Sequence, residues 1–238
     1  MAPAITLFDI PSVVPNQFWS PNTLKARYVL NYKGISFKTE WLEYPAIAPF
    51  YKKHGIAHTE TKPDGSPLYT LPVIHDANVK KYISGSTNFA SYLDATYPNT
   101  PSAFPNSTEG LARAFDAALM DAVTPIWALM FLNTAELLNP ESKTFFLQTK
   151  YSALEVDSVT EWARLQSGFS KVAQWTNGMG NFVMGDTVSF PDFAIGVLLF
   201  ALRNAFGEDS EEWRRVVSWD GGKWEKLAGQ LRKYETEV

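Results

Sequence analysis

A serine at the predicted start of a helix is the first residue in this sequence that could do chemistry. In the stretch FWSPNTLKARYVLNYKG, residues 18–34, Ser20 is typical of a helix N-cap and Pro21 of the first helical position. Two aromatic residues, Phe18 and Trp19, stand directly before it. A hydroxyl in this position caps the helix or donates to a ligand, and from the sequence both roles stay open.

A proline next to a predicted strand is the second candidate. In LPVIHD, residues 71–76, Pro72 opens the strand and has no N–H for the sheet, which suits an edge or a shaped turn. With a cis Leu71–Pro72 bond, the backbone of Val73 would face an extended peptide and pair with it as an added strand. Only about 5–6% of X–Pro bonds in folded proteins are cis, so residue rules alone favour a trans bond.

Gly85 and Ser86 begin another predicted helix. The free N–H groups of a helix start attract a carboxylate, and the Ser86 hydroxyl would add a donor, although most serines in such positions only cap. In GDTVSFPD, Ser189 and Asp192 have the spacing of a capping box, which we interpret as structural.

Three large side chains follow Pro125 at helical spacing: Trp127, Met130 and Phe131. We expect Pro125 to kink its helix and to aim this face into a cleft. The alternative is an ordinary core stripe, which helical spacing fits equally well.

The composition excludes several classes of site. The chain has 238 residues and no cysteine, which removes disulfides, thiolate metal sites and a cysteine nucleophile. The three histidines show no metal-ligand spacing, so no metal is expected. The net charge of -4 makes nucleic acid a poor partner, and no apolar run suggests a membrane span or a leader. We therefore expect a soluble cytoplasmic protein.

The predicted elements change character near residue 100. Strands and helices alternate before it, with strands expected at 5–10, 37–44, 71–76 and 80–84 and helices after Ser20, within 44–58 and after Gly85. The remainder is almost wholly helical. The sequence predicts an α/β domain at 1–98, a Pro-rich linker at 99–108 and an all-α domain at 109–238.

The chain resembles a glutathione transferase over nearly its whole length. The resemblance rests on three motifs that occur in this order: LPVI, STNFASYLD from Ser86 and GDTVSFPDF from Gly185. Two further segments resemble the fungal-specific class A of this family, which is related to β-etherases. They are WSPNTLKARYVLNYKG and EWLEYP. The resemblance implies a thioredoxin-like N-terminal domain that binds glutathione, an all-helical domain that supplies most of the electrophile pocket, and a homodimer.

Residue by residue, the resemblance makes Ser20 the catalytic serine, with Trp19 and Asn22 beside glutathione. It makes Pro72 the cis-proline, with Leu71 and Val73 around it, and Ser86 the ligand of the γ-glutamyl carboxylate. Most relatives carry an acidic residue just before that serine, whereas this chain has Gly85. The electrophile is expected near Phe18, Trp127, Met130 and Phe131.

Without cysteine, mixed-disulfide chemistry is excluded, and transfer of the glutathione thiolate to an electrophilic carbon remains. We expect Ser20 to cap its helix and to donate to sulfur at once, because its oxygen can accept from Asn22 or Thr23 while its proton points at the thiolate. Hydrophobic aromatic electrophiles, including aryl ethers, are the expected substrates. The alternative is a carrier of aromatic small molecules such as polyphenols, with little or no catalysis.

Overall fold

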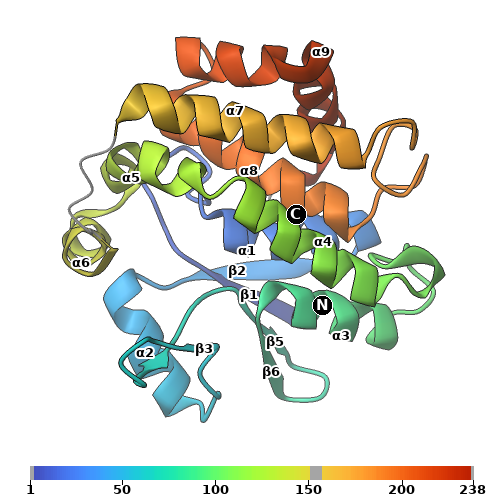
Figure 1. The fold of residues 1–238 in the computed structure, drawn as a ribbon. Coiled ribbons are helices and arrows are strands. Elements are labelled where there is room, and N and C mark those ends of the chain that lie inside the picture. Colours follow the sequence, from blue (N-terminus) through green and yellow to red (C-terminus); the bar gives the residue numbers. More distant parts are fainter. Residues whose placement is uncertain (1–2, 151–156, 237–238) are drawn as a thin grey trace. The chain divides into compact units, whose positions relative to one another are not determined.

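The computed structural model describes residues 3–150 and 157–236 (Figure 1). The chain divides into two compact units. One unit contains the chain up to Ser102 together with Leu137–Thr149 and the end of the chain from Tyr234. The other contains Ala103–Glu136 and the segment that ends at Lys233. The first boundary lies inside the expected linker, but a segment of the helical half groups with the first unit, so the division is not sequential.

A four-stranded mixed sheet forms the centre of the first unit, in the order β2-β1-β5-β6. Its strands are β1 (Ile5–Asp9), β2 (Phe37–Trp41), β5 (Val73–Asp76) and β6 (Lys81–Ser84). β1 runs parallel to β2 and antiparallel to β5, and β6 runs antiparallel to β5. The predicted βαβ opening is confirmed, and every expected strand is present with slightly shorter bounds. β1 is buried throughout, as an interior strand requires.

The helices of the first unit are α1 (Pro21–Lys33), α2 (Tyr44–Lys53), α3 (Ser86–Thr96) and α6 (Pro140–Lys150). α1 and α3 pack together, and the buried Lys33 ammonium bonds Asp94 at 2.7 Å between them. A small hairpin, β3 (Glu60–Thr61) and β4 (Pro67–Leu68), lies between α2 and β5. It could not be predicted, because two-residue strands carry no periodic signal.

The second unit is built of helices and loops and has no named strand in its described residues, as predicted. Beyond the short η1 (Pro105–Ser107) and η2 (Arg232–Tyr234), it contains α4 (Glu109–Ala122), α5 (Pro125–Leu137), α7 (Ser158–Trp175), α8 (Phe190–Phe206) and α9 (Glu211–Leu231). α8 is buried from Phe190 to Arg203, which identifies it as the central helix of this unit. α9 is interrupted at Trp219–Gly222, where three consecutive residues adopt positive φ.

Pro125 does not kink a continuous helix, so that expectation is wrong. It is the first residue of α5, and the axes of α4 and α5 differ by 76°. Proline suits the first helical position because it lacks the N–H that would be unpaired there. Within the described residues, no single helix is long and apolar enough to cross a membrane, although the bent α4–α5 pair has the length and composition for it when both helices are taken together.

The packing of α7 against the end of α4 predicts a large effect for a small substitution. A Cβ at Gly168 would lie 2.0 Å from the Ala122 carbonyl oxygen. We expect Gly168→Ala to lower the free energy of unfolding by about 1–3 kcal/mol, because two backbones must separate. Gly229→Ala in α9 is the matched control, since its Cβ meets open space. The control should gain about 1 kcal/mol from helix propensity alone. Urea unfolding measures both, and equal effects would contradict the close contact.

Candidate functional site

Four chain segments that carry candidate residues leave or enter the sheet at the same edge. Asp9 and Trp41 end the parallel strands β1 and β2 and are register partners. Val73 begins β5 beside Phe8, and Ser84 ends β6 beside Val73. The chain therefore leaves the sheet at this edge before α1, α2 and α3, and it enters the sheet at the same edge after the turn before β5.

Ser20 is the N-cap residue of α1, as predicted, and only 6% of its surface is exposed. Its carbonyl accepts from the Leu24 N–H at 2.9 Å and from the Thr23 hydroxyl at 3.1 Å. The expected hydroxyl cap is wrong: within the described residues, no hydrogen bond joins the Ser20 side chain to the first turn. The backbone alone starts the helix, which leaves the hydroxyl for another partner.

Phe18 and Trp19 are both buried beside this serine. The Phe18 ring lies 4.4 Å from the Arg27 guanidinium carbon, in the interior of the unit. That position favours support of α1 rather than the substrate contact predicted for Phe18. Trp19 packs on Tyr44, with ring centroids 6.3 Å apart. Its buried indole N–H has no acceptor among residues 3–150 and 157–236.

The Leu71–Pro72 bond is cis, which agrees with the resemblance and not with the residue rule. Val73 lies between β1 and β6, so its N–H and C=O point toward neighbouring strands and not toward a ligand. The predicted pairing of Val73 with a peptide therefore lacks free groups. Leu71 lies outside the ladder, and no backbone hydrogen bond of Leu71 occurs in the part of the chain that the structure describes.

Ser86 is the first residue of α3, with Gly85 at the N-cap. Gly85 has φ +85°, a conformation that favours glycine, and no side chain caps this described helix start. The N–H groups of the first turn are therefore left for an anion. Asn88 is held by its own bond to the Ser84 carbonyl at 3.2 Å.

The remaining predicted residues differ in exposure. Asn22 is exposed on the first turn of α1, and Trp127 is 38% exposed on α5. Phe131 is half-buried, whereas Met130 is buried in the second unit. The contacts of these four side chains with ligands stay predictions.

Sequence reasoning missed an aromatic cluster at the same edge of the sheet. The Tyr44 ring stacks on Phe145 of α6 with centroids 5.9 Å apart and planes inclined by 12°, and Phe146 lies at the same distance. Burial raises the pKa of the Tyr44 hydroxyl above its ordinary value, so it stays protonated. EWLEYP was the only local signal, because the partner helix lies about one hundred residues further along the chain.

Two family models match the chain. That of the glutathione S-transferase N-terminal domain matches residues 19–96, and that of the C-terminal domain matches residues 110–234. The chain belongs to the glutathione S-transferase family. Solved relatives support the assignment over the full length. A glutathione S-transferase of Ceriporiopsis subvermispora, in complex with glutathione, is 39% identical over 98% of both chains, with a TM-score of 0.90.

Two further relatives agree with this assignment. Glutathione transferase GSTFuA3 of Phanerochaete chrysosporium is 38% identical over 99% of both chains, with a TM-score of 0.93. A glutathione S-transferase-like protein of Aspergillus flavus, ustS, is 29% identical over 92% of this chain and 87% of its own. The thioredoxin-like unit, the helical unit and glutathione as co-substrate are thus properties of this transferase.

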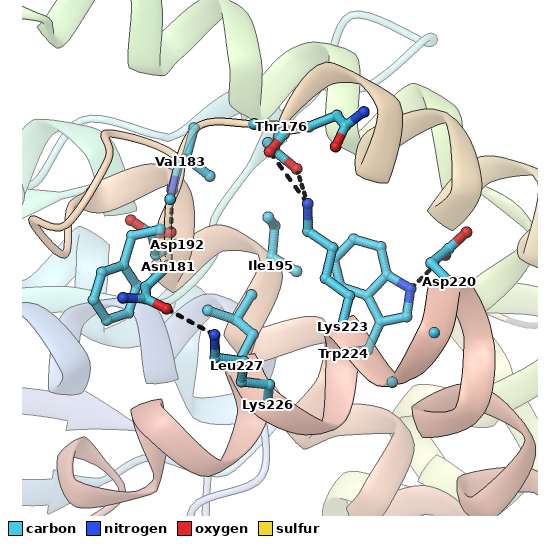
Figure 2. Close-up of a pocket in the computed structure, with 16 residues that line it drawn as sticks. Thr176, Asn181, Val183, Asp192, Ile195, Asp220, Lys223, Trp224, Lys226 and Leu227 are labelled. Atoms are coloured by element: carbon cyan, nitrogen blue, oxygen red, sulfur yellow. Dashed lines mark hydrogen bonds between the residues drawn. The ribbon is translucent and has the colours of Figure 1, made fainter.

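The transferase also has a cavity of about 270 Å³ in its second unit, between the 176–183 loop and the break in α9 (Figure 2). Its charged groups already have partners. The Lys223 ammonium donates to the Thr176 hydroxyl at 2.6 Å, and Lys226 donates to the Asn181 side chain at 2.7 Å. Burial lowers the pKa of Lys223. Lys223 also donates to carbonyl oxygens at the end of α7. We therefore interpret this cavity as a junction at which hydrogen bonds hold the helices together.

Asp192 borders this cavity and forms the predicted capping box with Ser189. Its carboxylate accepts from the Ser189 N–H at 2.9 Å, the Ser189 hydroxyl at 2.7 Å and the Val183 N–H at 2.8 Å. Burial nevertheless raises the pKa of Asp192 to about 6. The capping box ties the loop at Val183 to the start of α8.

This shifted pKa predicts a pH dependence of stability. The pKa of Asp192 is above its unfolded value, so its contribution to stability is largest below pH 4 and falls as the pH rises to 6. Two pKa units correspond to about 3 kcal/mol. Asp192→Asn should remove this slope in urea unfolding between pH 4 and 7. Asp186→Asn, at an exposed position of the same loop, should retain it, and an unchanged slope in Asp192→Asn would contradict the assignment.

Proposed function

We propose that this transferase uses the Ser20 hydroxyl to stabilise the glutathione thiolate and transfers it to hydrophobic aromatic electrophiles. The observation that carries the proposal is the buried Ser20 side chain at the start of α1, which takes no part in capping the described helix. A hydroxyl held at the positive end of a helix, and not bonded to the first turn of that helix, is a ready donor to an anion.

The reaction has one bond formed and one bond broken. A thiol with a pKa near 8.5 is mostly protonated at neutral pH, so donation from Ser20 and the α1 dipole raise the fraction of reactive thiolate. The sulfur forms a bond to the electrophilic carbon, the leaving group departs with its electron pair, and the thiol proton goes to solvent. Where the leaving group is a phenoxide, the same step cleaves an aryl ether.

Glutathione binding uses backbone groups of the first unit. The free N–H and C=O of Leu71 pair with the cysteinyl backbone of glutathione, in place of the predicted Val73. The start of α3 at Ser86 binds the γ-glutamyl carboxylate. The exposed Asn22 is a second donor near the sulfur. We further propose that the protein belongs to the fungal class A, forms a homodimer and is located in the cytoplasm. Analytical sedimentation tests the homodimer.

A carrier of aromatic molecules is the second candidate function. Gly85 favours it, since the acidic residue of most relatives would pair with the glutathione amine and glycine cannot. Weaker binding of glutathione would leave an aromatic site with little catalysis.

One pair of measurements separates the two functions. A conjugation assay with glutathione and chlorodinitrobenzene should show saturable turnover, and calorimetry should show glutathione binding. Saturable binding of aromatic molecules without any conjugation would instead support the carrier.

A further inference from the structure

The cavity at the break in α9 contains two ammonium groups whose hydrogen-bond partners are all neutral (Figure 2). The Lys223 ammonium donates to the Thr176 hydroxyl at 2.6 Å and to the carbonyl oxygens of Thr176 at 3.3 Å and Ala173 at 3.4 Å. The Lys226 ammonium donates to the Asn181 side-chain oxygen at 2.7 Å. Within the described residues, neither lysine forms an ion pair. The hydrogen bonds that hold the helices together thus also hold two positive charges at the cavity.

The carboxylates nearest to these lysines accept from other donors. Asp220 accepts from the Trp224 indole N–H at 2.7 Å and from a serine hydroxyl at 2.8 Å, and Figure 2 shows its carboxylate away from both ammonium groups. Asp192 accepts from the three donors of its capping box and loop. Asp186, outside the cavity, accepts from the Asn181 amide at 3.2 Å. An anionic ligand would therefore be the first direct negative partner of the two ammonium groups.

The loop after α7 adds backbone donors to the same cavity. The N–H groups of Gly178, Gly180 and Asn181, which line it, donate to no other group in the part of the chain that the structure describes. Gly178 has φ +72° and Gly180 has φ +102°, whereas Met179 between them has no positive φ. Glycine adopts such angles without strain, and successive N–H groups in a turn of this kind form a concavity that binds anions.

The cavity also has apolar walls and a defined size. Side chains of the loop, α8 and α9 supply the apolar part, namely Phe182, Val183, Ile195, Trp224 and Leu227. Its volume of about 270 Å³ lies just below the usual range of ligand pockets, which starts at about 300 Å³. A molecule of one or two rings, or a short aliphatic chain, fits this space.

We propose that this cavity binds a small organic anion, with its carboxylate at Lys223, Lys226 and the glycine loop and its apolar body against Ile195 and Leu227. Charged donors form stronger hydrogen bonds to a carboxylate than neutral donors do. None of the residues that line the cavity is assigned to glutathione. It is therefore a second ligand site on this transferase, independent of the role proposed for Ser20.

Calorimetric titration with 2-naphthoate tests this site, because the molecule has one carboxylate and an apolar body. S-hexylglutathione is present at saturation, so that a conjugate of the kind the transferase forms occupies the glutathione site. We expect saturable binding of one 2-naphthoate per chain. 2-Naphthalenemethanol has the same rings without the charge and should bind about 5-fold more weakly or worse. No saturable binding of 2-naphthoate, or equal binding of the two compounds, would overturn the proposal.

Lys226→Gln removes the positive charge but keeps a donor for the Asn181 oxygen. Because Lys226 is exposed, we expect the dissociation constant of 2-naphthoate to rise roughly 5- to 20-fold, less than for a fully buried charge. Lys226→Arg keeps the charge and should stay within about threefold of the parent. Lys223 is left unchanged because its ammonium also holds the end of α7.

Lys171→Gln is the matched control for net charge. It removes one positive charge from an exposed position of α7 that does not line the cavity, so the affinity for 2-naphthoate should equal that of the parent. An unchanged affinity in Lys226→Gln, or equal losses in Lys226→Gln and Lys171→Gln, would show that the cavity is not the binding site. Conjugation of electrophiles by the parent is measured separately, so either proposal can fail without the other.

Discussion

Ser20→Ala is expected to lower the conjugation rate about 10- to 100-fold while leaving the affinity for glutathione largely intact. The estimate follows from the 1.5–3 kcal/mol that a hydrogen bond to a charged group contributes, at 1.4 kcal/mol for each factor of ten. The Ser20 hydroxyl makes no capping bond in the described structure, so its removal should cost the fold little. The loss should therefore appear in turnover and not in stability.

The pKa of bound glutathione gives an independent measure of the same change. The parent should hold the thiol pKa below its free value, and Ser20→Ala should raise it by one to two units, measured by the ultraviolet absorbance of the thiolate. Ser86→Ala is a useful comparison because it should weaken glutathione binding without raising the thiol pKa. Ser36→Ala, at an exposed position, should change neither quantity. An unchanged rate and thiol pKa in Ser20→Ala would exclude the catalytic role.

Local features of this fold could be predicted because neighbours in sequence determine them. Pro21 and Ser20 mark a helix start wherever the helix packs, and the capping box at Ser189 and Asp192 is complete within four residues. The orientation of the Ser20 hydroxyl could not be predicted in the same way. It depends on what surrounds the buried side chain, and local rules describe only the first turn.

Features that depend on distant contacts were beyond the sequence. Tyr44 and Ser142 are 98 positions apart, so neither EWLEYP nor the pattern of α6 indicates that they meet. The cis bond before Pro72 is likewise set by its surroundings, and residue statistics favour the opposite isomer. The sequence predicted a ligand contact for Val73 because it does not give the order of the strands. Only that order places Val73 between two strands. These features of the candidate site could be described only from the structure.

Arg27→Met is expected to lower the free energy of unfolding by about 3–5 kcal/mol, the usual cost of breaking a buried ion pair. The side chains of Arg27 and Asp9 are both fully buried, and Nη2 lies 3.3 Å from the Asp9 carboxylate. The guanidinium also bonds the Thr39 hydroxyl at 3.1 Å and packs on the Phe18 ring. It thus joins α1 to the parallel strands β1 and β2 behind Ser20.

The pH dependence distinguishes loss of charge from loss of packing. Burial already raises the pKa of Asp9, and Arg27 is the strongest opposing influence, so Arg27→Met should raise that pKa further. A raised folded-state pKa means stability that is lost as the pH rises, so the variant should be least destabilised in acid. Urea unfolding across pH 4–8 measures this slope, and a pH-independent loss would indicate packing alone.

The double variant Asp9→Asn with Arg27→Met completes the comparison. Each single change leaves one buried polar group without its charged partner, whereas the double change removes both charges and should recover part of the lost stability. The Arg27 Nε and Nη1 atoms have no acceptor in the described chain, so the native pair is already incompletely satisfied. If the double variant equals the sum of the singles, the pair has no coupling, and Arg27 supports Ser20 only through its contacts with Phe18 and Thr39.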